Sequence, residues 1–369
     1  QVKMTIFPTD CLYELEYEHW FNENLKIDTK PLTIHEDDQI IITSKPPFMA
    51  TYPTGRHSFN CVTVHYENIH KKPLHSIHRL DRETSGTLIL GKNPTISRSI
   101  SFCFEHNLVK KCYFLIAKNK LNLSAQSFPL TAEERIGRSK DFFSRVLMNT
   151  FDKDSAEGKE AKTIFRFIDQ IDNYLLLLAY PHTGRQHQIR VHAAAHGFPL
   201  IGDKIYNGDP NLFIRYKDKV TTEQDYEELE LPRHALHAIA LNFPYDPNIN
   251  IAQLPVNERN SKNIKSIMNN TKRTIFTTPI PNDLREWIKS KNKIKSKNHS
   301  VDIDIDFDIK QLEDKIKDDM DLIWSNISSR YPDAFPEGAP YEYFTEEQAK
   351  EAVDFSEKIL IKVREHFKV

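Results

Sequence analysis

The chain of 369 residues lacks long apolar stretches and is poor in cysteine. No apolar run approaches the ~20 residues that a membrane-spanning helix needs. The longest run, residues 174–180, fits one buried strand. The four cysteines form no CxxC pair, which argues against a zinc module or disulfide scaffold and favours a reducing compartment. We therefore expect no membrane span and no metal site, and a cytoplasmic or nuclear location. The chain begins with Gln1, which leaves open a preceding segment with a targeting signal.

Glycine is also scarce, so its positions are informative. Five of the ten glycines lie in two short segments, residues 78–86 and 182–208. The net charge of −2 conceals an acidic end, because residues 301–369 contain 18 acidic and 9 basic side chains, whereas residues 1–300 carry 34 acidic and 41 basic ones. A basic body with an acidic tail is compatible with a nucleic-acid partner, although an ordinary solvated surface explains the charge alone equally well.

The secondary-structure pattern mixes strands and helices without the regular β–α–β rhythm of a doubly wound sheet. Short apolar runs predict strands at residues 39–43, 87–90, 112–118, 163–167 and 174–179, with a further apolar segment at 236–243. Helical spacing and end signals predict helices at residues 93–105, 187–196 and 281–289. This mixture indicates a mixed α+β fold.

The composition divides the chain into three parts. These are an N-terminal extension (1–36), a central domain (37–290) and an acidic, partly helical C-terminal extension (291–369). Residues 246–275 are rich in Asn, Lys and Ser, so we interpret them as a surface insertion, and residues 289–300 as a linker. The partly helical part is a long helix expected at residues 345–367.

The segment His78-Arg79-Leu80-Asp81-Arg82-Glu83-Thr84-Ser85-Gly86 places a carboxylate between two arginines. Arginines hold a carboxylate ionised and orient it by bidentate hydrogen bonds. An ionised, oriented Asp81 is suited to act as a nucleophile or a general base. A structural Arg–Asp pair at a turn is the alternative interpretation.

A second segment, His182 to His192, follows a predicted strand directly. Gly184 permits a tight turn, after which Arg185 and Arg190 project near the start of a helix. Such an element can pair with a buried carboxylate or bind a phosphate. Residues 202–206, Gly-Asp-Lys-Ile-Tyr, continue the region with another tight turn.

A third segment, Lys110-Lys111-Cys112-Tyr113, is a basic pair that enters a predicted strand and presents a tyrosine. A tyrosine on such a strand is most often part of the core. The alternative is that its ring stacks on a nucleic-acid base.

Together these segments resemble the RluA-type pseudouridine synthase family. The resemblance rests on HRLDRETSG (78–86), KCYFLIAK (111–118), TGRQHQIRVHAAAHGFPLIGDKIY (183–206), RHALHAIALNF (233–243) and KPPFMATYPTGR (45–56). It covers roughly residues 37–290. It implies a pseudouridine synthase-like α+β fold, with a mixed, mainly antiparallel sheet, flanking helices and a central RNA-binding cleft.

The resemblance also implies a reaction, the isomerisation of uridine to pseudouridine in RNA without a cofactor. Asp81 matches the family's catalytic Asp, which attacks the ribose or removes its 2′ proton. Arg190 matches the basic residue that pairs with this Asp, and Tyr113 the tyrosine that stacks on the flipped uracil and relays a proton. Arg79 is suited to fill the gap left by the extruded base. Contacts with RNA or the flipped base are expected from Arg79, Arg82, Arg185, His187 and Lys111.

Several positions depart from the family pattern. Phe48 stands where the first motif commonly has Gly, Tyr52 where it has His, and Phe243-Pro244 where a His-Pro follows the last motif. Residues 1–36 are too short for the S4 RNA-binding domain of many bacterial relatives. The variant at residues 54–56, Thr-Gly-Arg, is similar to eukaryotic tRNA-type members, which favours tRNA over rRNA as the partner of a monomeric enzyme.

Four other functions remain open at this point. An rRNA-directed synthase and a catalytically silent RNA-binding relative share the same motifs, although retention of Asp81, Tyr113 and Arg190 argues against the silent one. His192 and His196 have the i,i+4 spacing of zinc ligands, but no Glu follows His192 as HExxH requires. Ser85 lacks the GxSxG context of a serine hydrolase.

Overall fold

The computed structural model describes residues 28–53, 60–140, 146–209, 211–218, 220–246, 261–296 and 316. All of them lie within the first of two units into which the chain divides, residues 1–321 and 322–369. The helix expected at residues 345–367 lies outside the described residues. No helix in the described part of the chain is long and apolar enough to cross a membrane.

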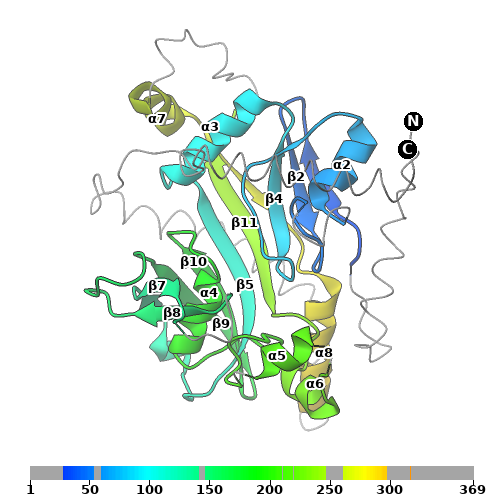
Figure 1. The fold of residues 1–369 in the computed structure, drawn as a ribbon, viewed down its shortest axis with the longest axis vertical. Coiled ribbons are helices and arrows are strands. Elements are labelled where there is room, and N and C mark those ends of the chain that lie inside the picture. The colour runs from blue at the N-terminus through cyan, green and yellow to red at the C-terminus, as the bar shows by residue number, and fades with distance from the viewer. Residues whose placement is uncertain are drawn as a thin grey trace, which may run out of the picture. The chain divides into compact units, whose positions relative to one another are not determined.

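One large sheet of ten strands organises the described residues (Figure 1). Its strands are β1 (Leu32–Glu36), β2 (Ile40–Lys45), β3 (His75–Ser76), β4 (Ser85–Gly91), β5 (Lys110–Lys118), β6 (Leu130–Ala132), β9 (Thr163–Ile171), β10 (Tyr174–Pro181), β11 (Leu236–Pro244) and β12 (Arg273–Thr277). They follow the order β1-β2-β4-β11-β5-β10-β9-β6, with β3 beside β4 and β12 beside β11. Every pair is antiparallel except β4–β11. The expected mixed, mainly antiparallel sheet is therefore confirmed.

Helices cover both faces of this sheet. They are α2 (Val62–His70), α3 (Pro94–Glu105), α4 (Gln188–Ala195), α5 (Leu212–Lys217), α6 (Glu223–Leu229), α7 (Ser261–Asn270) and α8 (Asn282–Ser296). Alternation along β2 sends Ile40 and Ile42 into the core beneath α3, and Ile41 into the core beneath α2. A separate two-stranded sheet, β7 (Arg135–Arg138) with β8 (Met148–Phe151), lies beside α4 (Figure 1).

The parallel contact between β4 and β11 depends on glycine. Gly86 has a φ of +116°, and a Cβ there would lie 2.2 Å from the carbonyl oxygen of Ala238 on β11. A side chain is therefore incompatible with this approach. Because the loop that carries Asp81 leads directly into β4, the contact fixes the end of that loop against β11.

Two predictions about the chain's organisation are wrong in part. Within the surface insertion expected at residues 246–275, residues 261–270 form α7 and residues 273–275 belong to β12, which pairs with β11. Their polar composition is that of elements with one solvated face, whose inner face buries Met268 and Phe276.

The expected linker at 289–300 is helical up to Ser296, the end of α8. Its lysines belong to the helix, as Lys291 shows by pairing with Glu230 at 2.9 Å and lying over the Trp287 ring. Within the acidic extension, the side chain of Ile316 is fully buried. The division of the chain near residue 290 stays a prediction.

Candidate active site

Asp81 lies on the loop between β3 and β4, beside the parallel contact of the sheet. A turn closes behind it, in which the Thr84 amide donates to the Asp81 carbonyl oxygen at 3.0 Å. Leu80, the preceding residue, is buried and anchors the loop in the core beneath α2. The side chain of Asp81 is 32% exposed, so its carboxylate remains accessible to a ligand.

Arg190 on α4 reaches this carboxylate from the interior. Its Nη1 donates to Asp81 Oδ2 at 3.4 Å, and the residue is only 5% exposed. Burial opposes ionisation of Asp81, but nearby positive charge, above all that of Arg190, outweighs burial and holds the pKa of Asp81 below its ordinary value. The carboxylate is therefore ionised at neutral pH.

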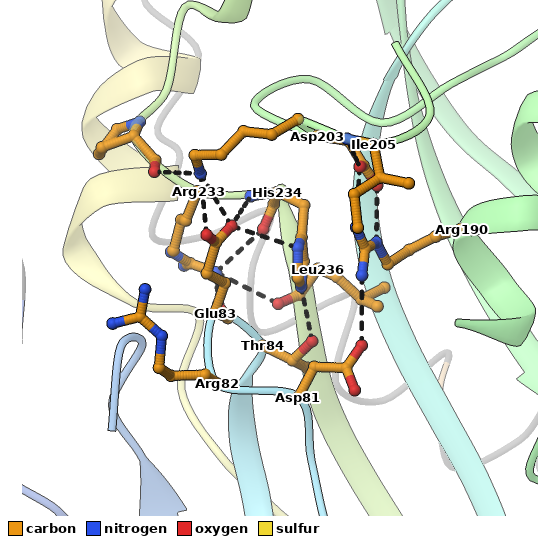
Figure 2. Close-up of polar contacts among 12 residues, drawn as sticks. Asp81, Arg82, Glu83, Thr84, Arg190, Asp203, Ile205, Arg233, His234 and Leu236 are labelled. Carbon is orange, nitrogen blue, oxygen red and sulfur yellow. Dashed lines mark hydrogen bonds and ion pairs between the residues drawn. The ribbon is translucent and has the colours of Figure 1, made fainter. Parts of the chain in front are cut away.

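Asp203 fixes the orientation of Arg190 (Figure 2). It accepts from Arg190 Nε at 2.6 Å and from Nη2 at 2.8 Å, which leaves Nη1 directed at Asp81. The amides of Ile205 and Tyr206 donate to Asp203 Oδ1, at 2.9 and 3.1 Å. Burial disfavours both charges, yet each partner's charge outweighs it, so the pKa of Asp203 is lowered and that of Arg190 raised. The guanidinium is thus a rigid, permanently charged clamp.

The sequence alone did not assign a role to Asp203. It lies at residues 202–206, Gly-Asp-Lys-Ile-Tyr, where the sequence indicates only a tight turn. Gly202 has a φ of +70°, and a Cβ there would lie 1.9 Å from the Arg233 carbonyl oxygen. This close packing positions Asp203 beside Arg190. The sign of this role in the sequence is an acidic residue directly after Gly202.

A second buried charge network supports the loop from the other side (Figure 2). Glu83 accepts from Lys204 Nζ at 2.9 and 3.0 Å and from the His234 amide at 3.2 Å. The His234 ring in turn bonds to the Thr84 hydroxyl through Nε2 at 2.7 Å. Burial opposes ionisation of Glu83, but Lys204 outweighs it and holds the pKa of Glu83 well below its ordinary value. The residues that follow Asp81 are therefore locked in place.

Lys45 holds the backbone of the same loop. Its fully buried ammonium donates to the carbonyl oxygens of Pro46, Met49 and Arg82, at 2.9, 2.8 and 3.0 Å. Burial, reinforced by the charge of Arg233, lowers the pKa of Lys45 well below its ordinary value. One buried cation thus ties the end of β2 to the residue after Asp81.

Tyr113 and His187 also lie near Asp81. Tyr113 is half-buried on β5 opposite Ala238, and burial together with the Asp81 charge raises the pKa of its phenol, which is therefore protonated at neutral pH. His187 precedes α4, with Nε2 3.9 Å from Asp81 Oδ2 and Nδ1 3.0 Å from the Tyr206 hydroxyl. Burial and the Arg190 charge lower the pKa of His187 to about 4, so its ring is neutral at neutral pH.

The other residues expected to contact RNA, which are Arg79, Arg82, Lys111 and Arg185, differ in their contacts. Arg79 is exposed, and its charge contributes to lowering the pKa of Asp81. The Arg82 guanidinium lies 5.6 Å from the centroid of the Phe48 ring. Lys111 Nζ donates to the Thr183 carbonyl oxygen at 2.9 Å, and Arg185 Nε to that of Glu160 at 2.8 Å. Lys111 and Arg185 therefore brace the turn before α4, and their contacts with RNA stay predictions.

The two histidines with zinc-ligand spacing have protein partners. His192 is within hydrogen-bonding distance of the Thr163 hydroxyl at 2.9 Å and of the Glu134 carbonyl oxygen at 3.0 Å. His196 lies 2.9 Å from a carboxylate oxygen of Glu134. Within the described ranges, no group of three or more His, Cys, Asp or Glu side chains is arranged to hold a metal ion. Packing on α4 accounts for both residues.

Comparison with known proteins finds similarity to one protein family. Residues 39–195, which include Asp81, Tyr113 and Arg190, match the family model described as RNA pseudouridylate synthase. The chain is 34% identical over 187 residues to ribosomal large subunit pseudouridine synthase C of Rickettsia prowazekii (strain Madrid E), covering 49% of this chain and 59% of that protein. It is 27% identical over 297 residues to the uncharacterized RNA pseudouridine synthase YjbO of Bacillus subtilis (strain 168), covering 79% of this chain and 87% of that protein.

The fold agrees with these sequence matches. The structure is similar to that of human RNA pseudouridylate synthase domain containing 4, with a TM-score of 0.50 and 18% identity, over 71% of this chain and 93% of that chain. Part of the chain is therefore similar to RNA pseudouridine synthases. It spans about three-fifths of the length of the Rickettsia relative.

Proposed function

We propose that the protein converts uridine in RNA to pseudouridine. In this reaction the N1–C1′ glycosidic bond breaks, the uracil turns, a C5–C1′ bond forms, the proton on C5 leaves to water, and N1 takes up a proton from water. The observation that carries the proposal is the ionised Asp81 carboxylate, accessible on one side and clamped on the other by Arg190, which Asp203 holds. Such preorganisation suits a carboxylate that must react with a ribose.

Asp81 is the proposed catalytic residue. In the part of the chain that the structure describes, Arg190 is the hydrogen-bond donor to its carboxylate, through Oδ2, and Oδ1 is left for the substrate. Two routes use this oxygen, attack on C1′ or removal of the 2′ proton. Deuterium at C2′ separates them, because only proton removal gives a primary isotope effect on the rate.

The proposed role of Tyr113 is to stack on the extruded uracil. Its phenol is protonated, since burial and the Asp81 charge raise its pKa, so it is suited to donate a hydrogen bond rather than to act as a base. Base–aromatic stacking is worth ~1–3 kcal/mol per base, which helps to offset the unstacking of the target nucleotide.

The class of RNA is the finer part of the proposal. The Thr-Gly-Arg variant at residues 54–56 supports tRNA. The name of the Rickettsia relative, a ribosomal large subunit enzyme, supports rRNA as the second candidate. Mapping pseudouridines in the tRNA and rRNA of cells that lack the protein decides between them, because only true target sites lose the modification.

The proposal includes a monomer that needs no cofactor and acts in the cytoplasm or nucleus. One chain supplies Asp81, Tyr113 and Arg190 together, so the site needs no second copy. Size-exclusion chromatography with light scattering tests the oligomeric state, and microscopy of the tagged protein tests the location.

Asp81→Asn tests the catalytic assignment. This change removes the charge but keeps the shape, so we expect loss of tritium release from RNA labelled at uracil C5, with folding retained. Asp38→Asn is the matched control, because Asp38 is exposed between β1 and β2. Near-normal turnover by Asp81→Asn contradicts the assignment. RNA binding without turnover in the wild-type protein instead indicates the catalytically silent alternative.

A further inference from the structure

Two aromatic rings on the loop after β2 lie against the two arginines that flank Asp81. The Arg82 guanidinium carbon is 5.6 Å from the centroid of the Phe48 ring, and that of Arg79 is 5.7 Å from the centroid of the Tyr52 ring. Both distances lie within the range of a cation–π contact. Phe48 and Tyr52 are also the positions at which the first motif departs from the pattern of the family that the sequence resembles.

The Tyr52 pair has a second contact. Arg79 Nη1 donates a hydrogen bond to the Tyr52 hydroxyl at 3.2 Å. Among the residues that the structure describes, Tyr52 is the hydrogen-bond partner of the Arg79 side chain, which is otherwise exposed. The Arg79 guanidinium is close enough to Asp81 for its charge to lower the pKa of that carboxyl. Tyr52 therefore restricts an arginine that acts beside the candidate catalytic group.

The backbone around Tyr52 is fastened to the loop that carries Arg79. The Thr51 hydroxyl donates to the Leu80 carbonyl oxygen at 3.4 Å and accepts from the Leu80 amide at 3.2 Å. Lys45 Nζ adds a bond to the Arg82 carbonyl oxygen at 3.0 Å. Since Thr51 and Leu80 are buried neighbours of Tyr52 and Arg79, the position of the ring relative to the guanidinium is set by the fold.

We propose that Tyr52 is the positioning residue of Arg79. It holds the guanidinium beside Asp81, so that Arg79 occupies the space vacated when the target uridine leaves the RNA stack. This inference rests on the proposed function. An exposed arginine loses much of its rotamer freedom when it is fixed, and a partner that restricts it beforehand reduces that loss in the flipping step. Tyr52 thereby accelerates base extrusion without contacting the reacting atoms.

The test separates the hydroxyl from the ring. RNA labelled with tritium at uracil C5 and purified from cells lacking the protein is the substrate, and single-turnover tritium release and RNA affinity are measured together. Tyr52→Phe keeps the ring and removes the hydrogen bond, so we expect the rate to fall about tenfold, equivalent to about 1.4 kcal/mol. RNA affinity is expected to change less than about twofold, with an unchanged melting temperature. Tyr52→His restores a hydrogen-bonding ring atom and is expected to recover part of the rate.

A double substitution shows whether Tyr52 acts through Arg79. In an Arg79→Met background, we expect Tyr52→Phe to have no further effect, because the guanidinium that it positions is gone. Tyr174→Phe is the control, since it also removes a tyrosine hydroxyl bonded at 2.8 Å, to Glu230 at a distant site, and should leave the rate unchanged.

Three outcomes overturn the inference. A wild-type rate in Tyr52→Phe removes any positioning role. An equal slowing in the presence and absence of the Arg79 side chain shows that Tyr52 acts by another route, and a loss of RNA affinity at an unchanged rate makes it a binding residue. If the wild-type protein itself releases no tritium, the proposed function fails, and with it the inference.

Discussion

The buried pair of Arg190 and Asp203 offers the sharpest test of how the site is held. Both side chains lie almost fully inside the protein, and two charge-assisted hydrogen bonds of 2.6 and 2.8 Å join them. Asp203→Asn keeps an oxygen for the amides of Ile205 and Tyr206 but removes the negative charge. Arg190 then faces only Asp81, at 3.4 Å. Removing one partner of a buried pair costs about 3–5 kcal/mol, because the other charge is left uncompensated.

This loss is large enough to measure by unfolding. For a domain of this size each kcal/mol shifts the melting temperature by ~2–4 °C, so we expect a fall of roughly 6–20 °C. Urea unfolding measures the free energy, and tritium release from labelled RNA measures turnover in the same preparations. Turnover is expected to fall as well, because the Arg190 guanidinium loses the contact that directs Nη1 at Asp81.

A double substitution separates stability from catalysis. Removing both charges of a buried pair leaves neither uncompensated, so Arg190→Met with Asp203→Asn, which keeps an oxygen for the two amides, should recover most of the lost stability. It should not recover turnover, because Asp81 has lost its clamp. A cost below about 1 kcal/mol for Asp203→Asn, or an active double variant, would refute the reasoning.

The remaining predictions address other parts of the molecule. Tyr113→Phe should keep folding and RNA affinity but lose turnover; unchanged turnover would remove the hydroxyl from proton transfer. Burial and the Arg185 charge lower the pKa of Lys111 from 10.5 to about 8. Between pH values of about 8 and 10.5, the Lys111 side chain is protonated in the unfolded chain but not in the folded protein. The free energy of unfolding should therefore rise with pH across this window, and it should rise less in Lys111→Met. A chain that ends at Asp321 keeps the buried Ile316 and lacks residues 322–369, and it should keep turnover. Loss of activity in a truncated protein that still folds would show that residues 322–369 contribute to turnover.

Sequence patterns predicted the elements that depend on local chemistry. The helix expected at residues 93–105 forms as α3, because Asn93 accepts hydrogen bonds from the amides of Thr95 and Ile96 and Pro94 follows it. The apolar runs became the central strands β4, β5, β10 and β11. Polar segments were harder to interpret, since β12 and the end of α8 use few apolar residues and depend on contacts with distant elements.

The candidate site likewise contains some residues that local motifs predict and others whose role depends on distant contacts. Asp81, Arg190 and Tyr113 were found through local motifs, and the structure places them near one another. The pairing of Asp203 with Arg190 depends on packing of the turn at Gly202 against Arg233, and no local pattern encodes that approach. In the sequence, Lys45 is a charged residue at the end of a strand. The structure shows that its buried ammonium donates to three carbonyl oxygens.

Phe48 stands where the first motif commonly has Gly, and its backbone adopts a conformation that favours glycine. Its φ of +64° lies in the left-handed region, where a side chain costs roughly 1–2 kcal/mol compared with glycine. The ring is only 7% exposed and packs in the core beneath α2, and burying a Phe contributes about 1.5–3 kcal/mol. The two effects are of similar size, and the contact with Arg82 adds to the favourable side. The backbone therefore keeps the path that a glycine would allow, and Met49 still offers its carbonyl oxygen to Lys45. Phe48 thus adds a contact with an arginine beside Asp81 while its backbone adopts a conformation that favours glycine.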